Sequence, residues 1–242
     1  MQTQMDPVWT EPPANAGRSV ALAAADLAAE RRLVERVFER CDAVMEAACA
    51  LSLAPPEFLG ALVANESGGC ADATRFEPAV YRHLQAVAAG QEPSFGSINV
   101  TELDHEAARL LPANDVTLHS RYLTPSFAAD PGQQLQSAPD EALREFATSW
   151  GYTQIMGYHM MGQPGTVRRL LDPSFHFRMA LRLLSEFAAS YQLDLGHEFP
   201  EMFCCWNTGR PYGKTFDPDY VDKGLRRMQI FRQLRQIRRA AR

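Results

Sequence analysis

The chain has 242 residues, of which 46% are apolar and 22% are charged. This composition is ordinary for a globular protein and excludes a mainly disordered chain, and the length suffices to bury a sizeable core. No apolar run approaches the roughly 18 residues of a membrane span. The first residues, MQTQMDPVWTEPP, lack the basic start and apolar stretch of a secretory signal, so we expect synthesis in the cytoplasm without a signal peptide.

The net charge of −5 is distributed unevenly along the chain. Residues 223–242 carry eight basic side chains and no acidic one, whereas residues 1–222 carry 16 basic and 29 acidic side chains. The acidic body argues against a protein that binds nucleic acid with its whole surface. The basic segment is either a solvated helix face that complements the helix dipole or a surface attracted to an anionic envelope of lipid or wall polymer.

The first part of the chain predicts two helices after a loose start. Residues 1–18 are rich in Pro, Asn and Gly and predict a flexible lead-in. Residues 19–54 carry apolar side chains at spacings of three and four, which predicts an N-terminal helical extension. Pro55-Pro56 ends this helix and begins a second one, because proline fits the first turn of a helix. Gly68-Gly69 ends the second helix.

The second part predicts a short β element between helices. Four prolines and a glycine make residues 112–139 loop-like, and Asp140 can cap a helix that runs through Trp150. The alternation in residues 151–156 predicts a short strand or hairpin. Three more helices are predicted at residues 173–196, at 198–206 and from 217 onwards. We therefore expect a mainly α fold with a small β element.

The cysteines and histidines form no recognisable disulfide or metal pattern. The five cysteines are odd in number and lack a C-x-x-C pair, so we expect buried or inert thiols. Neither His105-Glu106 nor His197-Glu198 continues into the H-E-x-x-H zinc motif. The segment Gly209–Thr215 is too short for a phosphate-binding loop, contains a proline and follows no predicted strand. We expect no metal and no cofactor.

Glu66 stands at the end of an otherwise apolar helix face. Leu59, Leu62 and Val63 precede it at helical spacing, so its carboxyl should emerge on the core side. Removal from water raises the pKa of a carboxyl, and a carboxyl that keeps its proton near neutral pH can act as a general acid. The alternative is a solvated glutamate at a helix C-terminus.

Several segments resemble, in this order, the sequence blocks of the lysozyme-like superfamily that includes the lytic transglycosylases. Residues 64–69 (ANESGG) resemble its E-S-G segment, residues 149–157 (SWGYTQIMG) its G-L-M-Q-I-M block, and residues 205–209 (CWNTG) its A-Y-N-x-G block. Residues 219–221 (DYV) then resemble its closing Y-V helix. The glutamate of the first block, here Glu66, is the catalytic acid/base of that superfamily.

The spacing of the blocks is closer to the phage-type N-acetylmuramidase branch. Gln154 follows Glu66 by 88 residues, far more than in a compact transglycosylase domain. That branch has a Phe-Glu motif shortly after the catalytic glutamate, here Phe76-Glu77 with Tyr81, and then a longer helical insert.

The resemblance also implies a domain organisation and a fold. After the lead-in and the N-terminal extension, residues 55–242 would form an α+β lysozyme-like catalytic domain with a β-hairpin at the active-site cleft. The helical insert would occupy about 78–140, and a basic helix would end the domain.

Cleavage of a glycosidic bond needs an acid and a group that stabilises the positive anomeric carbon. With Glu66 as the acid, Glu77 or Asp72 is a candidate second carboxylate; otherwise the N-acetyl oxygen of the substrate assists. The resemblance favours Glu77. The alternative is a salt bridge from Glu77 to Arg75 or Arg82.

The remaining candidate residues lie in or near the matched blocks. Gln154 offers a donor and an acceptor to sugar substituents, or it serves a structural turn. Asn207 and Ser67 either bond to the substrate or brace their own loops. Trp206 stands where tyrosine is usual, so it keeps an aromatic face and loses a hydroxyl. The side chains expected to stack on sugars are Tyr81, Tyr152, Trp206 and Tyr220.

The resemblance implies peptidoglycan glycan strands as the substrate. We expect a muramidase that hydrolyses the β-1,4 bond between N-acetylmuramic acid and N-acetylglucosamine. The alternatives are a lytic transglycosylase that forms 1,6-anhydro products and a wall-binding module that kept the cleft without the chemistry. Action at the bacterial cell wall without a signal peptide suggests phage lysis, a virion-associated enzyme or dedicated export.

Overall fold

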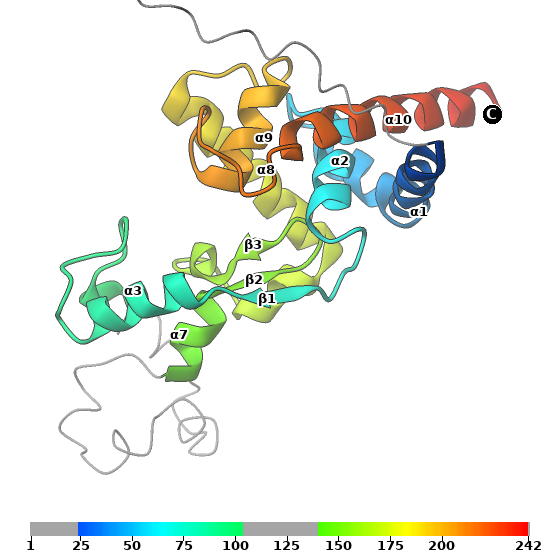
Figure 1. Cartoon of the computed structure of the whole chain (residues 1–242). Coiled ribbons are helices and arrows are strands. Elements are labelled where there is room, and N and C mark those ends of the chain that lie inside the picture. Colours follow the sequence, from blue (N-terminus) through cyan, green and yellow to red (C-terminus); the bar gives the residue numbers. More distant parts are fainter. Residues whose placement is uncertain (1–23, 104–139, 242) are drawn as a thin grey trace, which may run out of the picture.

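The computed structural model describes residues 24–103 and 140–241, which Figure 1 colours along the chain. Helices predominate in these residues and the strands form one small antiparallel sheet, so the predicted mainly α class with a small β element is confirmed. The lead-in predicted at residues 1–18 and the loop predicted at 112–139 lie outside the described residues. The α-helices are α1 (Ala24–Cys49), α2 (Pro56–Glu66), α3 (Pro78–Ala88), α7 (Asp140–Phe146), α8 (Pro173–Tyr191), α9 (Phe199–Thr208) and α10 (Tyr220–Ala240).

Helix α2 lies at the centre of the helical part. Seven consecutive residues from Phe58 to Ala64 are buried, because α1 and α10 both pack on this helix (Figure 1). Helix α10 approaches so closely that a Cβ on Gly60 would lie 2.4 Å from the ring of Phe231. Glycine is therefore the residue that allows this crossing, and the contact fixes α2 in the helical core.

The sheet consists of β1 (Thr74–Phe76), β2 (Thr148–Trp150) and β3 (Ile155–Met156), paired in that order. Arg75 pairs with Ser149 across the first ladder, and Trp150 pairs with Ile155 across the second. Strands β2 and β3 form a hairpin, but only β3 lies within the predicted segment 151–156; β1 was not predicted, and β2 lies in a segment predicted to be helical. Figure 1 shows the chain leaving the lower end of α2 and entering β1, so the end of α2 lies next to the sheet.

The helix predicted from Asp140 through Trp150 is too long. Helix α7 ends at Phe146, and Thr148 begins strand β2. Thr148 and Trp150 favour an extended backbone, and both pair with residues of β1. Local helix propensity therefore yields to strand pairing across the sheet.

The other predicted helices are found with small changes at their ends. Asp172 caps α8 by accepting a hydrogen bond from the backbone N–H of Phe175 at 2.7 Å. The last helix begins at Tyr220, and the backbone N–H of Tyr220 bonds to the oxygen of Asp217 in the preceding turn. Two short 3₁₀ helices, η2 (Gly157–Met160) and η3 (Val167–Leu171), connect the hairpin to α8.

The basic side chains of α10 face acidic partners within the protein. Six of them form ion pairs: Lys223 with Asp217, Arg226 and Arg227 with Glu30, Arg232 with Glu57, Arg235 with Asp42 and Glu46, and Arg238 with Asp42. Most of these partners lie on α1, so the uneven charge in the sequence holds the N-terminal helix against the last one. Contact with an anionic envelope stays a prediction.

The thiols are all unpaired. Four of the cysteines are buried, as expected, but Cys70 is exposed beside Asp72, to which its thiol donates a hydrogen bond at 3.0 Å. Within residues 24–103 and 140–241, no helix is long and apolar enough to cross a membrane. The same residues contain no group of three or more His, Cys, Asp or Glu side chains arranged to hold a metal ion.

Candidate active site at the end of helix α2

Glu66 is the last residue of α2, and its carboxyl is removed from water. The chain turns directly after it, with Gly68 at a φ of +62°, a conformation that glycine adopts without strain. The hydroxyl of Tyr220 donates a hydrogen bond to Oε1 of Glu66. Burial raises the pKa of Glu66 to about 7, although the hydrogen bond from Tyr220 and the charge of Arg75 act in the opposite direction. The raised pKa expected from the sequence is therefore found.

Arg75 connects the two candidate carboxylates. Its Nε donates to Oε1 of Glu77 at 2.6 Å, so Glu77 forms the salt bridge that was the alternative to a catalytic role. The charge of Arg75 also acts on Glu66. Arg75 projects from the edge strand β1 and Glu77 follows it as the N-cap residue of α3, so this ion pair lies at the edge of the sheet. Asp72 is exposed and pairs with Cys70.

Ser67 and Gln154 brace the hairpin loop. The hydroxyl of Ser67 donates to the backbone oxygen of Tyr152 at 2.6 Å, which ties the end of α2 to this loop. Gln154 has a left-handed backbone with φ of +55°, and its amide group donates to the oxygens of Ala73 and Gly151. Its Oε1 accepts a hydrogen bond from Ser149 at 2.8 Å. These contacts match the structural alternatives that the sequence left open for both residues.

Two of the predicted sugar-stacking residues are buried. Tyr152 is 8% exposed and stacks on Phe177 with ring centroids 5.1 Å apart, so it presents no open face to a sugar. Tyr220 is 7% exposed and directs its hydroxyl at Glu66. The aromatic faces of both side chains pack into the protein core, and their role in binding a sugar stays a prediction.

The two other predicted aromatic residues are partly accessible. Trp206 is half-buried and donates its indole N–H to the backbone oxygen of Thr153 at 3.0 Å, so this donor serves the hairpin loop. The hydroxyl of Tyr81 donates a hydrogen bond to Asp140, and the guanidinium of Arg144 lies over the Tyr81 ring, 4.6 Å from its centroid. These contacts join α3 to α7. Asn207, beside Trp206, is exposed on α9.

A buried histidine that the sequence did not single out also holds the hairpin loop. His176 Nδ1 bonds to the oxygen of Leu170 at 2.8 Å, and Nε2 accepts from the backbone N–H of Thr153 at 2.9 Å. Burial lowers the pKa of His176 to about 4, so the ring is neutral near pH 7 with its proton on Nδ1. The sequence signal was only its place in the first turn of α8, which does not reveal a partner 23 residues away.

Replacing His176 by leucine should destabilise the protein by about 2–4 kcal/mol, because the Thr153 N–H and the Leu170 oxygen lose their buried partner. Urea unfolding at pH 7 measures this change. The matched control is His197→Leu, because His197 is exposed and bonds only at the surface to Asp194. Equal stabilities for the two variants would contradict the role of His176.

Comparison with protein-family models found no match, and comparison with curated proteins found none either. Among solved structures, the chain is similar to the crystal structure of Burkholderia AP3 phage endolysin. The identity is 18%, the match covers 79% of this chain and 71% of that chain, and the TM-score is 0.43. A function for this chain is therefore inferred from the residues of the candidate site.

Proposed function

We propose that this chain is a muramidase that hydrolyses the β-1,4 bond between N-acetylmuramic acid and N-acetylglucosamine in peptidoglycan. The observation that carries the proposal is the Glu66 carboxyl, which is partly removed from water at the end of an apolar helix and has a pKa of about 7. A carboxyl with this pKa keeps its proton in a large share of molecules near neutral pH and can give it to a leaving oxygen.

The hydrogen bond from Tyr220 makes the two carboxyl oxygens of Glu66 chemically different. The Tyr220 hydroxyl donates to Oε1, so the acid proton resides on Oε2. Oε2 gives this proton to the glycosidic oxygen as the bond to the anomeric carbon breaks. The leaving sugar departs with a new hydroxyl, and Glu66 is left as a carboxylate that Tyr220 and Arg75 stabilise.

Glu77 is the proposed second carboxylate. Its ion pair with Arg75 requires the charged form, and a charged carboxylate can stabilise the positive anomeric carbon or accept a proton from the attacking water. Arg75, whose charge also acts on Glu66, holds this side chain at the edge of the sheet. Trp206 and Asn207 are the proposed sugar contacts, because both reach the surface on α9 and Trp206 also contacts the hairpin loop.

The same ion pair favours one alternative, a lytic transglycosylase. A carboxylate already paired with Arg75 is partly neutralised, and the N-acetyl oxygen of the substrate can stabilise the anomeric carbon in its place. The Glu66 carboxylate then takes the proton from the C6 hydroxyl of the sugar that carries this anomeric carbon. The C6 oxygen attacks the anomeric carbon and closes a 1,6-anhydro ring.

Mass spectrometry of digested peptidoglycan tests the proposed hydrolysis. We expect muropeptides with reducing ends, which are heavier by one water molecule than the 1,6-anhydro products of the alternative. Glu77→Gln should slow the hydrolysis, whereas it should have little effect on a transglycosylase that relies on the N-acetyl group. Binding to peptidoglycan without any cleavage would contradict both reactions and favour a wall-binding module.

The proposed place of action is the bacterial cell wall. The proposed routes to the wall are phage lysis, a virion-associated enzyme and dedicated export. In each case the glycan strand is the proposed partner.

A further inference from the structure

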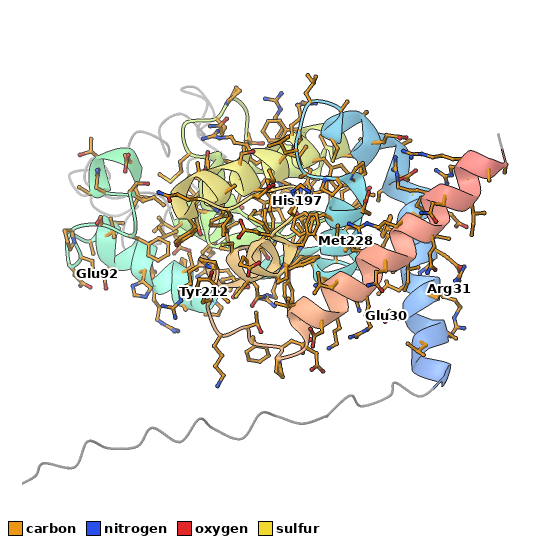
Figure 2. All side chains as sticks on the ribbon, turned by 90° about the horizontal axis from the view of Figure 1, so that it is seen from above. Glu30, Arg31, Glu92, His197, Tyr212 and Met228 are labelled. Carbon is orange, nitrogen blue, oxygen red and sulfur yellow. The ribbon has the colours of Figure 1, made fainter. Side chains whose placement is uncertain are left out.

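A largely buried ion pair connects the N-terminal helix to the end of α2. Glu30 on α1 accepts a hydrogen bond from Nε of Arg227 on α10 at 3.2 Å. Nη1 of Arg227 then donates to the backbone oxygen of Ala64 at 2.9 Å and to Oδ1 of Asn65 at 2.8 Å. Figure 2 shows Glu30 on the side of α1 that faces α10. Arg227 therefore caps the backbone carbonyl of Ala64 in the last turn of α2, where a cation is favoured by the helix dipole.

The connection continues from Asn65 to the candidate acid. Nδ2 of Asn65 donates to the backbone oxygen of Tyr220 at 3.1 Å, which fixes the start of α10 against α2. Tyr220 then directs its hydroxyl at Oε1 of Glu66. Each of these contacts joins residues that are far apart in sequence or lie on different helices, so none of them follows from helix geometry alone.

The Arg227 guanidinium depends on Glu30 for its position. The side chains of Glu30 and Arg227 are only 9% and 14% exposed. Burial lowers the pKa of Arg227, and the charge of Glu30 opposes this change. A buried cation without its partner is costly, so an Arg227 that lost Glu30 would turn towards water and release Ala64 and Asn65.

We propose that Glu30 is a positioning residue for the site: through Arg227 and Asn65, it holds Tyr220 in hydrogen-bonding distance of Glu66. The inference rests on the proposed function, since it assigns a role in a reaction that Glu66 would carry out. It gives the N-terminal helix a part in the chemistry without any contact between that helix and the substrate.

The direction of the expected change follows from the hydrogen bond at Glu66. Tyr220 donates to the charged carboxylate and lowers the pKa of Glu66 against the effect of burial. Loss of this bond should therefore raise the pKa of Glu66. The charge of Arg75 also lowers the pKa of Glu66. The charges of Asp217 and Arg226 act on the pKa of Arg227. Arg226 also contacts Glu30 at 3.4 Å, so Glu30→Gln changes the surroundings of both arginines.

The experiment is a carboxyl-carbon NMR titration of the full chain labelled with ¹³C-glutamate. Glu66→Gln identifies the Glu66 signal by its loss. In Glu30→Gln, we expect the Glu66 pKa to rise by roughly one unit, which is the scale of a lost hydrogen bond to a charged group. The rate of peptidoglycan cleavage should fall several-fold. The pH at which this rate declines should rise by the same amount as the Glu66 pKa.

Glu35→Gln is the matched control. It removes the same charge from the same helix, but Glu35 pairs with Arg31 at 2.9 Å on the exposed surface. Figure 2 shows Arg31 on the side of α1 that faces away from α10. This variant should leave both the Glu66 pKa and the cleavage rate unchanged.

The Tyr220→Phe variant tests whether Glu30 changes the Glu66 pKa through Tyr220. In Tyr220→Phe the hydroxyl is absent, so adding Glu30→Gln should produce little further change in the Glu66 pKa. If Glu30→Gln lowers thermal stability but leaves the Glu66 pKa in place, Glu30 is only structural and the inference is wrong. The same holds if the two substitutions shift the pKa additively. Because the titration needs no substrate, a chain that cleaves no peptidoglycan would overturn the proposed function while leaving this result readable.

Discussion

Glu66→Gln should lower the rate of peptidoglycan cleavage by about 10³-fold or more while leaving the fold intact. Glutamine has nearly the shape of a protonated glutamic acid and can still accept the hydrogen bond from Tyr220, but it has no acidic proton for the leaving oxygen. Release of soluble fragments from purified peptidoglycan measures the rate. In the unchanged protein, cleavage should decline above about pH 7 as Glu66 loses its proton.

The matched control is Glu92→Gln, because Glu92 is an exposed partner of His83 far from α2 (Figure 2). It should keep full activity. Full activity in Glu66→Gln would rule out the general acid proposed here.

Stability provides an independent measurement on the same variant. The pKa of Glu66 rises from an ordinary 4.5 to about 7 on folding, so the protonated form favours the folded state. This contribution is fully present below pH 4.5 and is lost as the pH rises to 7. Glutamine does not titrate, so Glu66→Gln should gain stability relative to the unchanged protein over that interval. A constant difference would mean that the carboxyl is not buried.

Asp42→Ala should destabilise the protein by about 3–5 kcal/mol. Asp42 is 5% exposed and forms ion pairs with Arg235 and Arg238, which hold α1 to α10. Its removal leaves Arg235 buried with only the half-exposed Glu46 as a partner, at 2.5 Å. Urea unfolding at pH 7 measures the loss.

Two comparisons separate the cost of an unpaired charge from the value of the pair. Replacing Asp42 and Arg235 together by leucine should cost much less than Asp42→Ala, because no buried charge remains between them. Glu35→Ala, which breaks the exposed pair with Arg31, should cost less than about 1 kcal/mol. An equal loss for the single and double replacements would show that packing, and not charge, holds the two helices.

The sequence predicted those elements whose ends are marked by local chemistry. Pro56 and the glycines after Glu66 define α2, and Asp172 caps α8. Strand β1 escaped prediction because three residues are too few for a periodic pattern, and its pairing partner Ser149 lies 74 residues from Arg75 in sequence. Helix α7 was extended too far because the same distant pairing determines where it ends.

In the candidate site, too, features with a local sequence pattern were predicted and contacts between distant residues were not. The apolar face before Glu66 is a local pattern, and it predicted the direction of the pKa change. The contact from Tyr220 spans 154 residues and no local pattern could indicate it. Tyr152 shows the limit of a local pattern, since an aromatic residue in a matched block looks the same in sequence whether its ring faces the substrate or Phe177.

The register of the sheet has a consequence for chain length. Phe76 ends β1 directly opposite Thr148 at the start of β2, so the chain between them leaves and returns at one fixed pair. Closing a loop costs entropy that grows slowly, at about 0.6 kcal/mol for each doubling of its length. Helices α3 and α7 lie between these two ends and bury side chains such as Leu84 and Phe146, so a change in chain length leaves Glu66 and the hairpin in place only where it spares these two helices. Insertion of one residue within β2 itself would instead turn the side chains that follow it to the opposite face of the sheet.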